Sequence, residues 1–102
     1  MTEGRIREVL NIYRTYFEAN GIPKTEVPHD SFPTFNDDCF AHLHAMLHQT
    51  ECFLREGRLD KVFRWLGFIQ GVLWIMGVYT VEELKEHNTD INANITNSWP
   101  FG

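Results

Sequence analysis

One run of apolar residues limits what this chain can fold into more than any other feature. Between residues 59 and 76, apolar side chains recur at alternating intervals of three and four: Leu59, Val62, Leu66, Ile69, Leu73 and Met76. This spacing is typical of a helix that packs along one seam against a partner helix. A second helical pattern covers about residues 37–56, and only Gly57 separates the two. Because so short a connection makes two long helices fold back on each other, the sequence predicts an antiparallel helical hairpin.

The second helix of this hairpin, which ends at Gly77, is apolar on another side as well. That second stripe contains Trp65, Phe68, Val72 and Ile75. A helix that is apolar on two sides is buried on two sides. A chain of 102 residues makes one domain, with too little further protein to cover both stripes. We therefore expect part of this surface to meet another subunit, with Gly67 and Gly71 as the strip that another backbone approaches closely.

The rest of the chain adds two helices and a loop. Apolar positions from Ile6 to Phe17 predict an N-terminal helix that ends at Asn20-Gly21. Residues 22–35 contain three prolines and predict an ordered loop, whose apolar anchors are Val27, Phe32 and Phe35. Asn36, followed by two aspartates, predicts the cap of the next helix. Thr80 and Glu83 form a capping box that opens a short helix to about His87.

The predicted fold class is therefore all-α, in a single domain. Residues 1–36 hold the N-terminal helix and loop, residues 37–88 hold the hairpin and closing helix, and residues 89–102 form a mobile tail. The tail contains Trp99 and Phe101, to which we assign no role.

Charge and cysteine content exclude several classes of function. A net charge of -5 does not suit binding of a nucleic-acid polymer, which depends on many contacts from Lys and Arg to phosphates. Two cysteines are too few for a disulfide framework or a four-cysteine zinc site. The N-terminal residues lack the apolar segment of a signal peptide, and the longest apolar run, residues 65–79, is too short for a membrane span. We expect a soluble intracellular protein that does not bind membranes.

Histidines and cysteines gather in residues 39–52 without the spacing of a recognisable site. His44, His48 and Cys52 share one face, and His-x3-His is a pattern found in metal sites. No second cluster supplies a fourth ligand at a recognisable spacing, so we favour polar residues on a packed helix. A nucleophile elbow, a glycine-rich phosphate loop and a His-Glu-x-x-His motif are all missing. We therefore expect no enzymatic activity and no cofactor.

The predicted turn of the hairpin is basic. Arg55, Arg58, Lys61 and Arg64 cluster around the start of the second hairpin helix. The unpaired backbone N–H groups at a helix start also favour anions, so the pattern predicts phosphate binding by Arg58, Lys61 and Arg64. Nearby acidic residues leave a second interpretation open, in which these cations are solvated or paired at the surface.

A second candidate binding surface lies near the N-terminus. Tyr13 and the neighbouring aromatic residues of the first helix precede Lys24 and Thr25. They either form a stacking surface beside a cation or belong to the core.

The string Arg-Trp-Leu-Gly-Phe-Ile-Gln-Gly-Val-Leu-Trp at residues 64–74 carries a resemblance to known proteins. Together with Gly77, the helix start at residues 80–85 and His87-Asn88, it resembles the helical hairpin shared by two phage families, anti-CBASS protein two and Thoeris anti-defence protein one. The resemblance covers about residues 39–88, half of the chain. It implies a non-enzymatic phage protein that forms a hexamer. Such proteins sequester cyclic nucleotide immune signals in the cytoplasm of the infected bacterial host.

The resemblance also implies roles for particular residues. In the anti-CBASS family, cyclic dinucleotides lie between protomers, where a tyrosine of the N-terminal helix stacks on a base near a lysine. By their order along the chain these would be Tyr13 and Lys24, with Thr25 beside the lysine. Cyclic trinucleotides meet symmetry-related arginines, and the matching residue is Arg64. The Thoeris family has a β-rich N-terminal part where this sequence predicts a helix. The anti-CBASS arrangement is therefore favoured over one that binds cyclic ADP-ribose isomers.

The leading hypothesis is sequestration of cyclic di- or trinucleotides without cleavage. One alternative is a phage protein that docks on a host protein through the apolar hairpin and binds no nucleotide. The other alternative is an enzyme that cleaves the signal.

Overall fold

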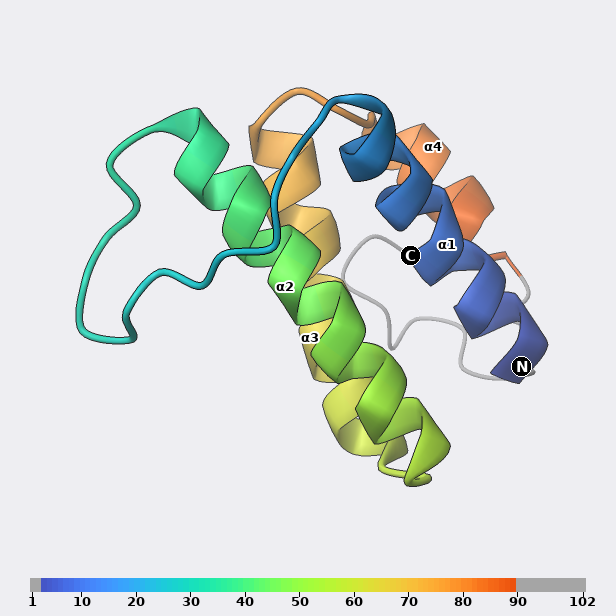
Figure 1. The fold of residues 1–102 in the computed structure, drawn as a ribbon. Helices are drawn as coiled ribbons and strands as arrows, with labels where there is room; N and C mark the ends of the chain where they lie inside the picture. The colour runs from blue at the N-terminus through green and yellow to red at the C-terminus, as the bar shows by residue number, and fades with distance from the viewer. Residues whose placement is uncertain (1–2, 90–102) are drawn as a thin grey trace.

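The computed structural model describes residues 3–89, and within that range the chain forms four helices and no strand. The helices are α1 (Glu3–Ala19), α2 (Asn36–Arg55), α3 (Leu59–Ile75) and α4 (Val81–His87). The predicted hairpin is confirmed: α2 and α3 pack side by side, α1 packs against α2, and α4 lies next to α1 (Figure 1). None of the helices in the described range is long and apolar enough to cross a membrane. The predicted tail, apart from Thr89, lies outside the described residues.

The turn of the hairpin is short because the end of α2 closes on a glycine. Gly57 has a φ of 74°, in the left-handed region that glycine adopts without a steric penalty. Its N–H donates to the Leu54 carbonyl at 3.1 Å, and the Arg58 N–H donates to the Phe53 carbonyl at 2.9 Å. This pair of bonds is the Schellman motif. It reverses the chain at once, so that α3 begins at Leu59 with Arg58 as its N-cap.

The starts of α2 and α4 follow the predicted positions, with one difference. The predicted capping box of α4 is confirmed, since the Glu83 N–H donates to Thr80 Oγ1 at 3.1 Å and the Thr80 N–H donates to Glu83 Oε1 at 3.0 Å. The cap of α2 was wrongly assigned to Asn36, which is already the first helical residue. The Asp38 carboxylate does the capping instead and accepts the N–H of Phe35 at 3.2 Å.

All four helices contribute to one apolar core. Its fully buried side chains are Ile6, Val9, Leu10, Tyr13, Phe17, Leu43, Leu47, Leu54, Val62, Leu66, Ile69, Leu73 and Leu84. The middle of the predicted seam of α3 supplies four of these, whereas its first residue, Leu59, is 40% exposed. The second stripe of α3 remains partly uncovered, because Phe68 is 55% exposed and Ile75 is 70% exposed.

The loop between α1 and α2 is held by hydrogen bonds, and the predicted aromatic anchors were wrong. Phe32 is 92% exposed, and Phe35 is exposed as well. The Thr25 N–H donates to the Ala41 carbonyl at 3.2 Å, and the Val27 N–H donates to His42 Nδ1 at 2.9 Å. These bonds attach the first half of the loop to the side of α2.

A polar network lies inside the core and joins α1, α3 and α4. Gln70 Nε2 donates to both Tyr13 Oη and Asn88 Oδ1 at 2.8 Å, and Asn88 Nδ2 donates back to Gln70 Oε1 at 2.9 Å. Because the Tyr13 oxygen accepts from Gln70, its hydroxyl proton is available for His87 Nδ1, 2.9 Å away. Arg5 donates to the carbonyl of His87 at 3.1 Å and so fixes the end of α4 from outside.

Candidate functional site

Three of the four cations predicted to cluster at the turn come together in the structure, whereas Arg55 donates to the Cys52 sulfur at 3.2 Å. Arg58, Lys61 and Arg64 line one surface hollow at the start of α3, together with Asp60. The three cations follow each other at intervals of three residues, so they wind around the first two turns of the helix.

Phe53, at the end of α2, organises two of these cations. The Arg58 guanidinium carbon lies 5.2 Å and the Lys61 ammonium 4.8 Å from the centre of the Phe53 ring, which are cation–π distances. The ring of Phe53 also packs edge-on against Trp65, with the two ring centres 4.9 Å apart. The contact of Phe53 with these cations was not predicted from the sequence. Its position four residues before Gly57, about one helical turn from the basic residues, was the available signal.

Arg64 differs from its neighbours in having no partner among the described residues. Arg58 pairs with Glu56 at 3.9 Å, and both side chains are about half exposed, so this ion pair contributes little. Arg64 is exposed and forms neither an ion pair nor a hydrogen bond anywhere in residues 3–89. Within that range its guanidinium is available for an external anion.

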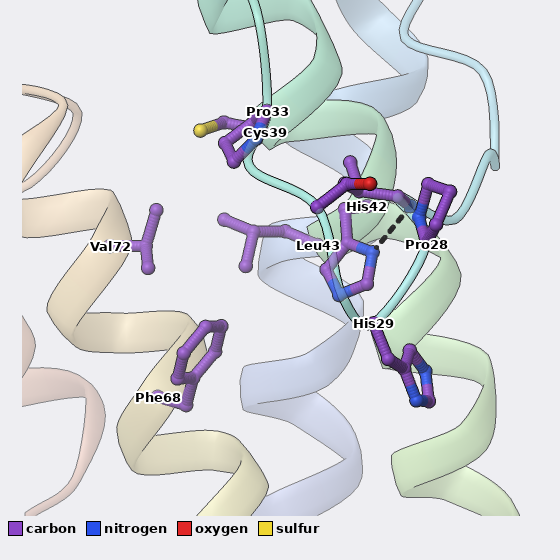
Figure 2. Close-up of a pocket in the computed structure, with 10 residues that line it drawn as sticks. Pro28, His29, Pro33, Cys39, His42, Leu43, Phe68 and Val72 are labelled. Carbon is purple, nitrogen blue, oxygen red and sulfur yellow. Dashed lines mark hydrogen bonds between the residues drawn. The ribbon is translucent and has the colours of Figure 1, made fainter.

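A second hollow lies farther along α3, beneath the loop. It is a cavity of about 300 Å³ whose walls come from α2, α3 and residues 27–33. Figure 2 shows Phe68 and Val72 of α3 on one side and Leu43 and His42 of α2 on the other. Pro28 and Pro33 of the loop also line it, so the wall is largely apolar.

Lys24 and Thr25 do not belong to the basic group at the turn. Both are exposed, and the loop that carries them is bonded to Ala41, in the N-terminal half of α2. At 1.5 Å per residue, Ala41 and Arg55 are separated by about 21 Å along the helix. Within one chain, Lys24 and Thr25 therefore form a candidate site that is separate from the basic residues at the turn.

Tyr13 belongs to the core, so the expectation that it stacks on a base has to be corrected. Its side chain is fully buried and contacts the rings of Tyr79 and His87. Burial raises the pKa of its hydroxyl above the usual range. The helical pattern gave the correct side of α1, but the ring lies too deep to offer a face to a ligand.

The histidines and cysteines of α2 do not gather into a metal site. His44 is buried and donates from Nδ1 to the Ile22 carbonyl at 2.8 Å, while His48 Nε2 lies 4.0 Å from the Cys52 sulfur. In residues 3–89 no group of three or more His, Cys, Asp or Glu side chains is placed to hold a metal ion.

Comparisons with protein-family models, with curated proteins and with solved structures found no match to this chain. A functional hypothesis therefore depends on the side chains described above and on the resemblance of the hairpin sequence.

Proposed function

We propose that this protein binds and sequesters cyclic di- and trinucleotide immune signals, as a phage anti-defence sponge in the cytoplasm of the infected host. The observation that carries the proposal is Arg64, which has no partner within residues 3–89 and lies beside Arg58 and Lys61 at the turn of the hairpin. In a chain with a net charge of -5, these cations make a local site and not a basic face. A small cyclic phosphate needs only one such site, whereas a nucleic-acid polymer needs an extended surface.

Assembly into an oligomer, most simply the hexamer of the anti-CBASS family, would bring several copies of Arg64 to one ligand. The glycines of α3 support a close contact between chains. Apart from its chain neighbours and the adjoining backbone of α3, a Cβ atom placed on Gly67 or Gly71 meets no atom of the described residues within 4 Å, so packing within residues 3–89 does not require glycine at either position. Each glycine inside a helix costs up to about 1 kcal/mol relative to alanine. We attribute this cost to a contact between chains, in which the backbone of another chain approaches α3 more closely than a larger side chain would allow.

Binding without cleavage is the form of the proposal that the hollow favours. Of the described residues that line it, Asp60 is the one carboxylate, and none is a histidine, serine, threonine or cysteine. General acid–base cleavage of a phosphodiester calls for a positioned base and acid. Lys24 and Thr25 remain candidates for a separate dinucleotide site between protomers, now without Tyr13.

The test is a thermal-shift and calorimetric panel of cyclic dinucleotides, cyclic trinucleotides and cyclic ADP-ribose isomers. Arg64→Ala should abolish cyclic trinucleotide binding while assembly stays intact, and Arg64→Lys should restore part of it, because lysine lacks the planar fork that grips two phosphate oxygens. Arg7→Ala, which removes an exposed arginine of α1, is the matched control. Mass spectrometry of the heat-released ligand should find it intact. Wild-type affinity in Arg64→Ala would refute the assignment of this residue.

A second candidate function is docking on a host protein through the apolar side of α3. The exposed side chains of Phe68, Trp74 and Ile75 favour it. Docking becomes the better interpretation under two conditions. The panel finds no nucleotide ligand, and the wild type binds a host protein that Ile75→Asp no longer binds.

A further inference from the structure

The cavity beneath the loop lies directly along α3 from Arg64. Phe68 follows Arg64 by four residues, and Val72 follows Phe68 by another four, so the three side chains share one face of the helix. Four residues correspond to about 6 Å along the helix axis. An anion on Arg64 is therefore one helical turn from the mouth of an apolar cavity.

The wall of this cavity that belongs to α3 offers an aromatic surface. The Phe68 side chain is 55% exposed, and in Figure 2 its ring stands at the edge of the cavity, opposite Leu43 and His42. A planar heteroaromatic ring stacks well on such a surface, because the geometry requires only a free π-face and an apolar surround. The volume of about 300 Å³ is large enough for a purine and leaves room for water.

His42 adds one directional polar group to this apolar wall. Its Nδ1 accepts the Val27 N–H at 2.9 Å, so in the neutral ring the proton is on Nε2. Within residues 3–89, Nε2 has no hydrogen-bond partner. The Val27 bond fixes the orientation of the ring and leaves an N–H donor for a ring nitrogen or a carbonyl oxygen of a ligand.

We propose that this cavity is the base-binding part of the nucleotide site, and that Phe68 and His42 determine which base is preferred. The base stacks on Phe68 and accepts a hydrogen bond from His42, while the phosphate attached to the same nucleoside meets Arg64. The inference rests on the proposed function. It commits to a nucleotide because a cation next to a cavity with an aromatic wall and an oriented N–H donor matches an anion covalently joined to a planar ring. A plain polyanion would use the cations alone.

Calorimetry with cyclic triadenylate and cyclic triuridylate tests this proposal. Phe68→Leu keeps an apolar side chain but removes the ring, and it should weaken triadenylate binding roughly tenfold, a typical loss for one stacked base. Triuridylate should lose less, because a pyrimidine has the smaller stacking surface. Phe68→Tyr should bind like the wild type. Phe35→Leu, which removes an exposed aromatic residue that does not line the cavity, is the matched control and should change neither affinity.

The outcomes separate this inference from the proposed function. If the wild type binds neither ligand, both fail. If Arg64→Ala loses both ligands while Phe68→Leu and His42→Leu bind them as the wild type does, the base site is wrong and the function stands. Phe68→Leu could fail to bind because it alters assembly, so a second measurement uses the wild type alone. A cyclic trinucleotide that contains the fluorescent base 2-aminopurine should lose fluorescence when that base stacks on Phe68. Binding with unchanged fluorescence would overturn the proposal.

Discussion

Replacing Gln70 with leucine tests whether the buried polar network holds α4 in place. The Gln70 amide makes three hydrogen bonds of 2.8–2.9 Å, two of them with Asn88, and both residues are fully buried. After the change, Tyr13 still donates to His87, but Asn88 loses both of its side-chain hydrogen bonds to Gln70, so its Oδ1 and Nδ2 are left unpaired. Each unpaired buried polar group costs about 1–3 kcal/mol, and the added apolar burial of leucine returns roughly 1 kcal/mol. We therefore expect the free energy of unfolding to fall by about 1–5 kcal/mol.

Urea denaturation followed by circular dichroism measures this loss, at two protein concentrations so that assembly does not obscure it. Asn88→Leu alone should be similarly costly, because it leaves the Gln70 amide without two of its three hydrogen bonds. The double variant should cost clearly less than the two single losses combined, since it removes both members of the pair and leaves neither unpaired. A loss below about 0.5 kcal/mol for Gln70→Leu, the range of ordinary surface changes, would refute this reasoning, as would strict additivity.

Two further predictions concern pH and assembly. Burial, with a smaller contribution from Arg5, lowers the pKa of His87, so the unfolded chain takes up the proton first as pH falls. The stabilisation that neutral His87 contributes is complete above about pH 6.5 and is lost as pH falls below that value. The wild-type melting temperature should therefore fall between about pH 7.5 and 5.5 more steeply than that of His87→Gln. Equal slopes for the two proteins would contradict this prediction. Gly71→Leu should split or destabilise the proposed oligomer, because the larger side chain overpacks the contact between chains at a cost of about 1–3 kcal/mol. If light scattering finds that the wild type is a monomer at micromolar concentration, the proposed interface along α3 is excluded.

The helices could be predicted because their signals are local. The apolar spacing along residues 59–76 depends only on the helical period, and the end of α2 depends on Gly57 alone, whose positive φ is the backbone state that the turn requires. The hairpin then follows from the shortness of the turn. The clustering of Arg58, Lys61 and Arg64 could be predicted for the same reason, since all three lie within two turns of one helix.

How deeply a side chain is buried, and which distant residues it contacts, could not be predicted in this way. The period places Tyr13 on the apolar side of α1, but whether that ring is covered depends on Tyr79 and His87, which arrive from far along the chain. Phe32 is apolar and therefore predicted to anchor the loop, yet it is exposed, and the loop is attached to α2 through backbone N–H groups of Thr25 and Val27. Gln70 is the one polar side chain inside the apolar run of residues 65–79, and that position was the available signal for a buried network.

The proposed subunit contact and the proposed ligand site lie on different sides of the exposed face of α3. Successive residues turn by about 100°, so Gly67 and Gly71 fall on one side of Arg64, and Phe68 and Val72 fall on the other. Another chain can therefore approach along the glycine strip without covering the cavity beneath the loop. Arg64 then stands at the boundary between the two surfaces, where copies from neighbouring chains can meet one cyclic ligand. The proposed arrangement would account for an arginine that interrupts the most apolar part of the sequence without an ion-pair partner in residues 3–89.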